Sequence, residues 1–114
     1  MSQAHKATIE KFTSAVNARH VNHLNEVLAE NVEKTENHKV VYNNIKEARE
    51  YYSMEHEAHP SINYKILKFD DQDEHNHTLK ATIVYNNHQY ETIYTFSSDG
   101  KIQKINSLLI QQDN

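Results

Sequence analysis

The sequence contains no cysteine and no tryptophan, and it has only one glycine and one proline. The lack of cysteine excludes disulfide bonds and thiol chemistry and is typical of cytoplasmic proteins, so we predict a cytoplasmic location. No apolar run approaches the roughly 20 residues that a membrane-spanning helix requires. The net charge is -4, and the lysines are scattered among acidic residues, which leaves no basic surface for a nucleic-acid backbone. We therefore expect neither a membrane nor a nucleic acid as a partner.

The chain is rich in tyrosine and histidine, with seven tyrosines and nine histidines among 114 residues. Disordered chains usually lack aromatic residues, so this composition predicts a folded protein. The length suits a single small domain over residues 1–114. Because such domains have a limited core, they often gain stability by pairing, and we expect an oligomer.

Three helices are predicted before residue 60. Apolar residues recur at helical spacing over residues 3–18 and, after a break in phase, over residues 21–30. A third helix is predicted to begin after Asn44, with Glu47 three residues later at the spacing of a capping box. Pro60 ends this helix, because the residue before a proline disfavours the helical conformation.

The segment "VEKTENHKVVY" between the second and third helices has no helical period, which predicts one or two short extended segments. If side chains alternate through it, Glu36, His38, Val40 and Tyr42 lie on one face. His38 is then a candidate hydrogen-bond partner for Glu36.

From residue 61 the apolar period changes to two, and three runs rich in β-branched and aromatic residues predict strands. Their sequences are "INYKILKF", "TLKATIVY" and "YETIYTF". A last strand, "KIQKINSLLI", follows the turn signal "SSDGK", in which Gly100 can adopt a positive φ without a Cβ clash.

The connections between these strands predict their register. The sequence "NNHQ" indicates a tight hairpin centred on residues 87–88, which places Tyr85 opposite Tyr90. Placing Ile66 opposite Ala81 across the preceding connection puts Ile66 on the same face of the sheet as Ala81, Tyr85 and Tyr90. A slip of one residue would reverse the faces, so the agreement between the two hairpins favours this arrangement.

The order of elements predicts an α+β domain in which helices come first and a meander of antiparallel strands folds over them. The sheet face turned away from the helices carries Val84 and Ile93 among polar residues. In a small chain, such a half-apolar outer face is typical of a homodimer surface.

The sequence resembles the NTF2-like superfamily, and more closely its SnoaL-like and ketosteroid-isomerase-like branches, over residues 5–110. The segments that carry the resemblance are "FTSAVNARHVNHLNEVLAENV", "NNIKEAREYY" and "IYTFSSDGKIQKI". The resemblance implies a cone-shaped α+β barrel, with three N-terminal helices packed in a curved, mainly antiparallel sheet around a hydrophobic pocket. It also implies a homodimer that pairs through the outer sheet face.

The family includes isomerases, cyclases, dehydratases and proteins with no chemistry, so the resemblance does not select an activity. In its ketosteroid-isomerase-like enzymes, a first-helix tyrosine and a protonated late-strand acid stabilise an enolate while an early-strand acid moves the proton. Matched without gaps, these positions are Phe12, Thr92 and Glu36. Because two of the three groups are missing, we do not expect steroid-type isomerisation. Glu36 remains a candidate general base with His38 as its partner, and the alternative is a solvent-exposed glutamate.

Side chains from the first helix, the third helix and the strands are predicted to contact a ligand in the pocket. They are Phe12, Tyr52, Tyr64, Tyr85, Tyr90, Thr92, Tyr94 and Ile105. Hydroxyl groups on an otherwise apolar wall favour a small ligand that is apolar or of mixed polarity. The alternative for these aromatic residues is ordinary core packing.

Two histidine pairs, His56 with His59 and His75 with His77, lack a recognisable third and fourth metal ligand. We therefore expect no metal and no cofactor. Three functions remain open: binding of a small molecule in the cone, an isomerase, cyclase or dehydratase activity with Glu36 as general base, and a non-catalytic dimerisation or assembly domain whose cone is filled by side chains.

Overall fold

The computed structural model describes residues 2–61 and 63–110. In chain order, the described elements are α1 (Ser2–Asn17), the 3-10 helix η1 (Val21–Glu26), β1 (Leu28–Glu36), β2 (Lys39–Tyr42), α2 (Ile45–Ala58), β3 (Lys65–Asp73), β4 (Thr78–Tyr85), β5 (His88–Phe96) and β6 (Ile102–Leu109). Neither α-helix of this part of the chain is long and apolar enough to cross a membrane.

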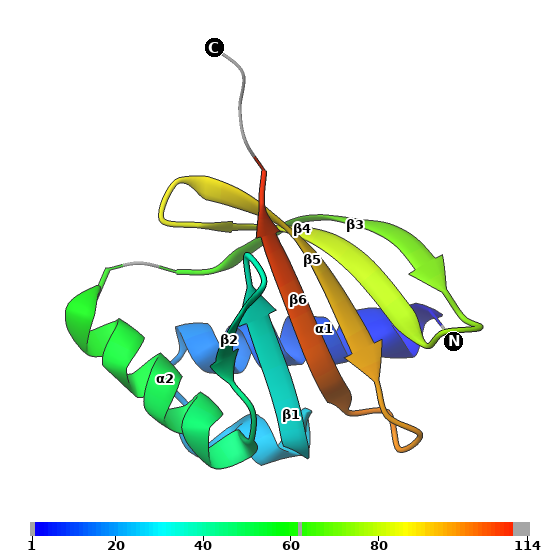
Figure 1. Ribbon diagram of the computed structural model, residues 1–114. Coiled ribbons are helices and arrows are strands. Elements are labelled where there is room, and N and C mark those ends of the chain that lie inside the picture. Colours follow the sequence, from blue (N-terminus) through cyan, green and yellow to red (C-terminus); the bar gives the residue numbers. More distant parts are fainter. Residues whose placement is uncertain (1, 62, 111–114) are drawn as a thin grey trace.

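The strands form one curved sheet in the order β2-β1-β6-β5-β4-β3. Strands β1 and β6 run parallel, and the other neighbouring pairs are antiparallel. Figure 1 shows α1 crossing one face of this sheet, while α2 lies beside β1 and β2. The predicted α+β architecture, in which a mainly antiparallel sheet curves over helices, is confirmed.

The core fills the space between α1 and the concave face of the sheet. Ile9 and Val16 of α1 are buried there, as are Leu79 and Ala81 of β4 and Ile105 of β6. These residues recur at helical spacing in α1 and at every second position in β4, so each element buries one face. Burial of this apolar surface is what holds the helix in the curve of the sheet.

The end of α1 is fastened to the connection between α2 and β3. The side chain of Asn17 donates to the carbonyl oxygen of Tyr64 at 2.7 Å and accepts from the Tyr64 amide at 2.8 Å. Arg19 donates to the carbonyl oxygen of Pro60 at 2.6 Å, and the His56 ring nitrogen Nε2 lies 2.5 Å from the carbonyl oxygen of Val16. These bonds fix where Tyr64 enters the interior.

The second predicted helix is wrong in length and type. Over residues 21–30 the structure has a short 3-10 helix followed by β1, which begins at Leu28. Val21, Leu24 and Val27 are spaced by three residues, which suits the three residues per turn of a 3-10 helix as well as it suits an α-helix. The carbonyl oxygen of Val27 then accepts from the Ile102 amide at 2.8 Å, so sheet pairing ends the helix.

The sequence correctly predicted which side chains of β4 and β5 face the core, but the pairing register of both hairpins is shifted by two residues. Residues 86–87 form the turn, with φ of 54° and 65°, and therefore Tyr85 pairs with His88. A two-residue turn with positive φ at both positions matches the right-handed twist of the strands. Similarly, Ile66 pairs with Ile83, two residues from the predicted partner. A shift of two keeps the side chains of β4 and β5 on their predicted faces, whereas two register shifts interrupt the alternation of β3 after Ile66.

The start of α2 confirms the predicted cap. The Asn44 side chain accepts a hydrogen bond from the Glu47 amide at 2.8 Å, and the Glu47 carboxylate accepts from the Asn43 amide at 3.0 Å. Both bonds satisfy amide groups that the helix itself leaves without partners. The helix ends at Ala58, two residues before Pro60.

We expect the substitution Asn44→Ala to lower the free energy of unfolding by about 1 kcal/mol, because it leaves the Glu47 amide without its acceptor. Urea denaturation followed by far-ultraviolet circular dichroism measures this change. Asn22→Ala is the matched control, since Asn22 is exposed and lies outside both α-helices. Equal losses in the two variants would contradict a capping role for Asn44.

Candidate functional site

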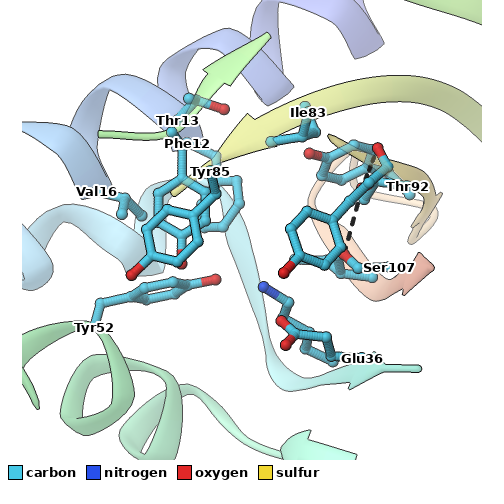
Figure 2. A pocket seen from close by; sticks show the side chains of 14 residues that line it. Phe12, Thr13, Val16, Glu36, Tyr52, Ile83, Tyr85, Thr92 and Ser107 are labelled. Carbon is cyan, nitrogen blue, oxygen red and sulfur yellow. Dashed lines mark hydrogen bonds between the residues drawn. The ribbon is translucent and has the colours of Figure 1, made fainter. Parts of the chain in front are cut away.

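A small cavity lies between α1, α2 and the concave side of the sheet. Its volume is about 30 Å³, a few times the minimum that one water molecule needs. Figure 2 shows Phe12, Thr13 and Val16 of α1 on one side, with Thr92 and Ser107 of the sheet opposite. The complete lining consists of Phe12, Thr13, Val16, Lys34, Glu36, Tyr52, Tyr64, Ile83, Tyr85, Tyr90, Thr92, Tyr94, Ile105 and Ser107.

The most unusual side chain in this lining is Lys34 of β1, which is only 5% exposed. Its ammonium nitrogen Nζ lies 5.7 Å from the ring centroids of Tyr51 and Tyr64 and 5.9 Å from that of Tyr52. Three aromatic faces thus surround one buried amine at the outer limit of cation–π contact. Lysine is rarely buried without a partner, so its position requires an explanation.

The pairing of β1 with β2 becomes irregular beside this lysine. Lys34 is opposite Tyr42, whereas the next residue, Thr35, is opposite Val40. The extra residue in β2 is a bulge, a feature that often re-aims side chains beside functional sites.

Burial lowers the pKa of Lys34, because removal from water disfavours the charged form. The negative charges of Glu36 and Glu55 act in the opposite direction and offset part of this effect. Within residues 2–61 and 63–110, the ion pairs closer than 4.0 Å do not include Lys34. The amine therefore lies in the aromatic interior without a direct carboxylate partner among these residues.

Tyrosine hydroxyls form a hydrogen-bonded group around the cavity. The hydroxyl oxygens of Tyr42 and Tyr52 lie 2.8 Å apart, and Tyr85 donates its hydroxyl hydrogen to Glu55 of α2. Tyr64 and Tyr85 stack with ring centroids 4.2 Å apart. Burial raises the pKa of Tyr42, Tyr52 and Tyr64 above the ordinary value, so these phenols stay neutral and keep their hydrogen-bond donors.

Strands β5 and β6 supply a more polar wall. The hydroxyl oxygens of Thr92 and Ser107 lie 3.3 Å apart, the contact drawn as a dashed line in Figure 2. Across the cavity, Phe12 packs edge-on against Tyr52, with 5.9 Å between ring centroids. The cavity thus has an aromatic side and a hydroxyl-bearing side.

The eight side chains predicted to contact a ligand all line this cavity, and so does Glu36. Their common position follows from the correct parity of the strands and from the helical stripes of α1 and α2. Contact with a ligand and general-base chemistry at Glu36 remain predictions.

His38 does not lie where the sequence suggested. It is exposed in the turn between β1 and β2, outside the cavity lining, where Asn37 and His38 have φ of 51° and 72°. The chain reverses at these two residues, so the alternation that begins in β1 does not continue through them. Val40 is 58% exposed for the same reason, and the predicted pairing of Glu36 with His38 is wrong.

Two charged groups at the site were missed from the sequence. Lys34 follows Val32 and precedes Glu36 at every second position of β1, so alternation alone would have placed it inside with them. Its charge within "EKTEN" suggested solvent instead. Glu55 carried a weaker signal: it lies three residues after Tyr52 on the buried stripe of α2.

Among the described residues, no three or more His, Asp or Glu side chains gather in a way that could hold a metal ion. His59 is exposed at the end of α2, while the ring of His56 is directed to the Val16 carbonyl oxygen. Neither histidine lines the cavity.

No protein-family model matches the sequence, and no curated protein matches it either. Many solved structures do match. A SnoaL-like protein of unknown function from Burkholderia thailandensis has a TM-score of 0.82, with 8% identity over 97% of this chain and 98% of that chain. The chain has the NTF2-like fold.

Two further solved structures are also similar to this chain in fold at low sequence identity. A SnoaL-like polyketide cyclase from Agrobacterium tumefaciens has a TM-score of 0.74, with 12% identity over 94% of this chain and 91% of that chain. An NTF2-like protein of unknown function from Exiguobacterium sp. 255-15 has a TM-score of 0.73, with 12% identity over 92% and 99% of the two chains. At such low identity the NTF2-like fold is shared, but no specific activity is established.

Proposed function

We propose that the protein binds a small organic molecule of mixed polarity inside its cone. The observation that supports this function is the convergence of a buried amine, a carboxylate and several phenolic hydroxyls on one cavity with aromatic walls. Ligand sites commonly combine an apolar lining with a few polar groups that fix orientation. Neutral tyrosines and Lys34 can donate hydrogen bonds, so the ligand carries an acceptor oxygen, as in a carbonyl or hydroxyl group. The proposed location is the cytoplasm, in keeping with the absence of cysteine.

The free volume of about 30 Å³ limits the size of this ligand. A larger molecule would enter only if side chains at the cavity mouth moved, and Tyr85 and Tyr90 are the half-buried aromatic residues nearest the β4–β5 turn. A compact compound with one flat apolar face and one oxygen fits the lining best.

Ligand-observed NMR with a library of small ketones, aldehydes and phenols tests this function. We expect saturation transfer from the wild-type protein to at least one compound class, and we expect Ser107→Leu to abolish it by filling the cavity. Lys104→Leu is the matched control, because Lys104 is an exposed residue on the same strand. Binding that survives in Ser107→Leu, or no binding by any class, would contradict the proposal and favour a cone filled by its own side chains.

A second candidate function is acid–base catalysis, because Glu36 lines the cavity together with hydrogen-bond donors. A carboxylate so placed can remove a proton from a carbon next to the carbonyl group of a ligand. If the protein has this isomerase, cyclase or dehydratase type of activity, the Glu36→Gln variant should still bind the ligand but should no longer turn it over.

We propose that two chains pair through the outer face of the sheet, where half-buried Val84 and Ile93 and the 36% exposed Leu108 interrupt polar residues. Sedimentation velocity at low micromolar concentration is expected to show a two-chain species. Ile93→Lys should convert it to a monomer, whereas Val40→Lys, a change at an exposed residue of edge strand β2, should not. A wild-type monomer at this concentration would contradict the pairing.

A further inference from the structure

We propose that Lys34 is the nucleophile of the cavity and forms a Schiff base with the carbonyl carbon of a small aldehyde or ketone. This inference rests on the proposed binding function and assigns a chemical class to the ligand. It begins from the position of one amine: Lys34 lines the cavity, is 5% exposed and has three tyrosine rings within 5.9 Å of Nζ.

A lysine must be neutral to attack a carbonyl group, and the surroundings of Lys34 favour the neutral amine. Burial in an aromatic cage lowers its pKa, and no carboxylate of the described residues lies within 4.0 Å to hold the ammonium form. In contrast, Lys39, Lys46 and Lys104 are exposed to water. The amine in the interior is therefore a better nucleophile near neutral pH than these surface amines.

The proposed reaction uses groups that line the same cavity. The lone pair of Nζ forms a bond to the carbonyl carbon while the C=O π bond breaks, and one amine proton passes through the Glu36 carboxylate to the oxygen. The resulting carbinolamine then loses its hydroxyl group, which takes the second amine proton by the same route and leaves as water. The product is an imine between Lys34 and the ligand, so one carbonyl compound and one amine give one imine and one water.

The buried tyrosine hydroxyls have a defined part in this reaction. Neutral phenols such as Tyr64 keep their donors because burial and neighbouring charges raise their pKa. A hydrogen bond from such a phenol to the carbonyl oxygen polarises the C=O bond toward attack. Glu55 already accepts a hydrogen bond from Tyr85, which leaves Glu36 as the carboxylate of the lining that is available for proton transfer.

Reductive trapping with acetaldehyde and sodium cyanoborohydride tests the inference, because the hydride adds to an imine carbon and makes the link permanent. At about pH 7 we expect peptide mapping to find an ethyl group on Lys34 sooner than on any exposed lysine, since a lowered pKa leaves a larger fraction of this amine neutral. Lys34→Met and Lys34→Arg should both remove this fast modification. Lys39→Met, a change at an exposed lysine, should leave it intact.

The same samples separate failure of this inference from failure of the binding function. Saturation-transfer NMR without the reductant reports whether acetaldehyde enters the cavity at all. Binding without preferential modification of Lys34 would overturn the Schiff-base inference and leave the binding function standing. If neither acetaldehyde nor any library compound binds, both proposals are overturned. Circular dichroism of Lys34→Arg shows whether its loss of reactivity occurs in a folded protein.

Discussion

Replacing Tyr52 with alanine is expected to lower the free energy of unfolding by about 3–5 kcal/mol, the usual cost of deleting a buried aromatic side chain. Tyr52 is 2% exposed and packs against the rings of Phe12, Tyr42, Tyr51 and Tyr64. It therefore joins α1, α2, β2 and the connection that precedes β3. Its loss removes apolar contacts on every side and leaves the buried Tyr42 hydroxyl without its partner.

Chemical denaturation of wild type and Tyr52→Ala measures this loss, and Tyr85→Ala is the matched control because Tyr85 is only half-buried. A milder pair of variants isolates the hydrogen bond. Tyr42→Phe and Tyr52→Phe should each cost about 1–2 kcal/mol, whereas the double variant should cost less than their sum, since it leaves no unpaired hydroxyl. Additive losses would show that the two hydroxyls do not depend on each other.

Replacing Lys34 with methionine is expected to raise the free energy of unfolding by about 1–3 kcal/mol near neutral pH, because this buried amine has no ion-pair partner in the part of the chain that the structure describes. Methionine has a similar length and fills irregular spaces in a core. We expect the cost of burying the amine to exceed the stabilisation that its contacts with the three tyrosine rings provide.

The pH dependence of this gain follows from the lowered pKa of Lys34. The unfolded chain holds the lysine proton up to its ordinary pKa of 10.5, whereas the folded protein releases it at lower pH. Between these two values the unfolded state binds more protons, so wild-type stability rises with pH, by at most about 1.4 kcal/mol per unit from this group. The advantage of Lys34→Met should be complete below the folded-state pKa and should shrink as pH rises toward 10.5.

Urea denaturation of both proteins across this pH range measures the difference in stability directly. The buried tyrosines also affect stability above about pH 10. There the unfolded phenols ionise, while the raised pKa keeps the folded phenols neutral, so stability falls as pH rises. That effect is common to both proteins and cancels in the difference. Lys104→Met is the exposed control and should show no such trend. A less stable Lys34→Met protein would contradict the view that the amine is retained at a cost to stability.

The faces of the strands could be predicted because their pattern repeats every two residues. An error of two residues in a hairpin changes which residues pair, as for Tyr85 and His88, but moves no side chain to the other face. This is why every predicted lining residue of β4 to β6 reached the cavity. The pairing itself depended on positive φ at Asn86 and Asn87, a preference that asparagine shares with other turn residues.

Other features depended on contacts that the sequence does not contain. The spacing of Val21, Leu24 and Val27 suits two helix types, and only pairing of Val27 with Ile102 decides where the helix ends. Lys34 was hidden by the general rule that lysine is exposed, although its position in β1 pointed inward. Functional groups are expected to break such rules, because chemistry requires polar groups where packing alone would not place them.

The bonds between Asn17 and the backbone of Tyr64 have a consequence for how a molecule reaches the interior. They hold both the carbonyl oxygen and the amide of Tyr64, so the backbone of this lining residue is fixed to the end of α1. Tyr85, which stacks on Tyr64, is held instead by a single side-chain bond to Glu55 and lies next to the two-residue turn. Passage of a molecule into the cone should therefore depend on rotation of the Tyr85 side chain, while Tyr64 stays in place.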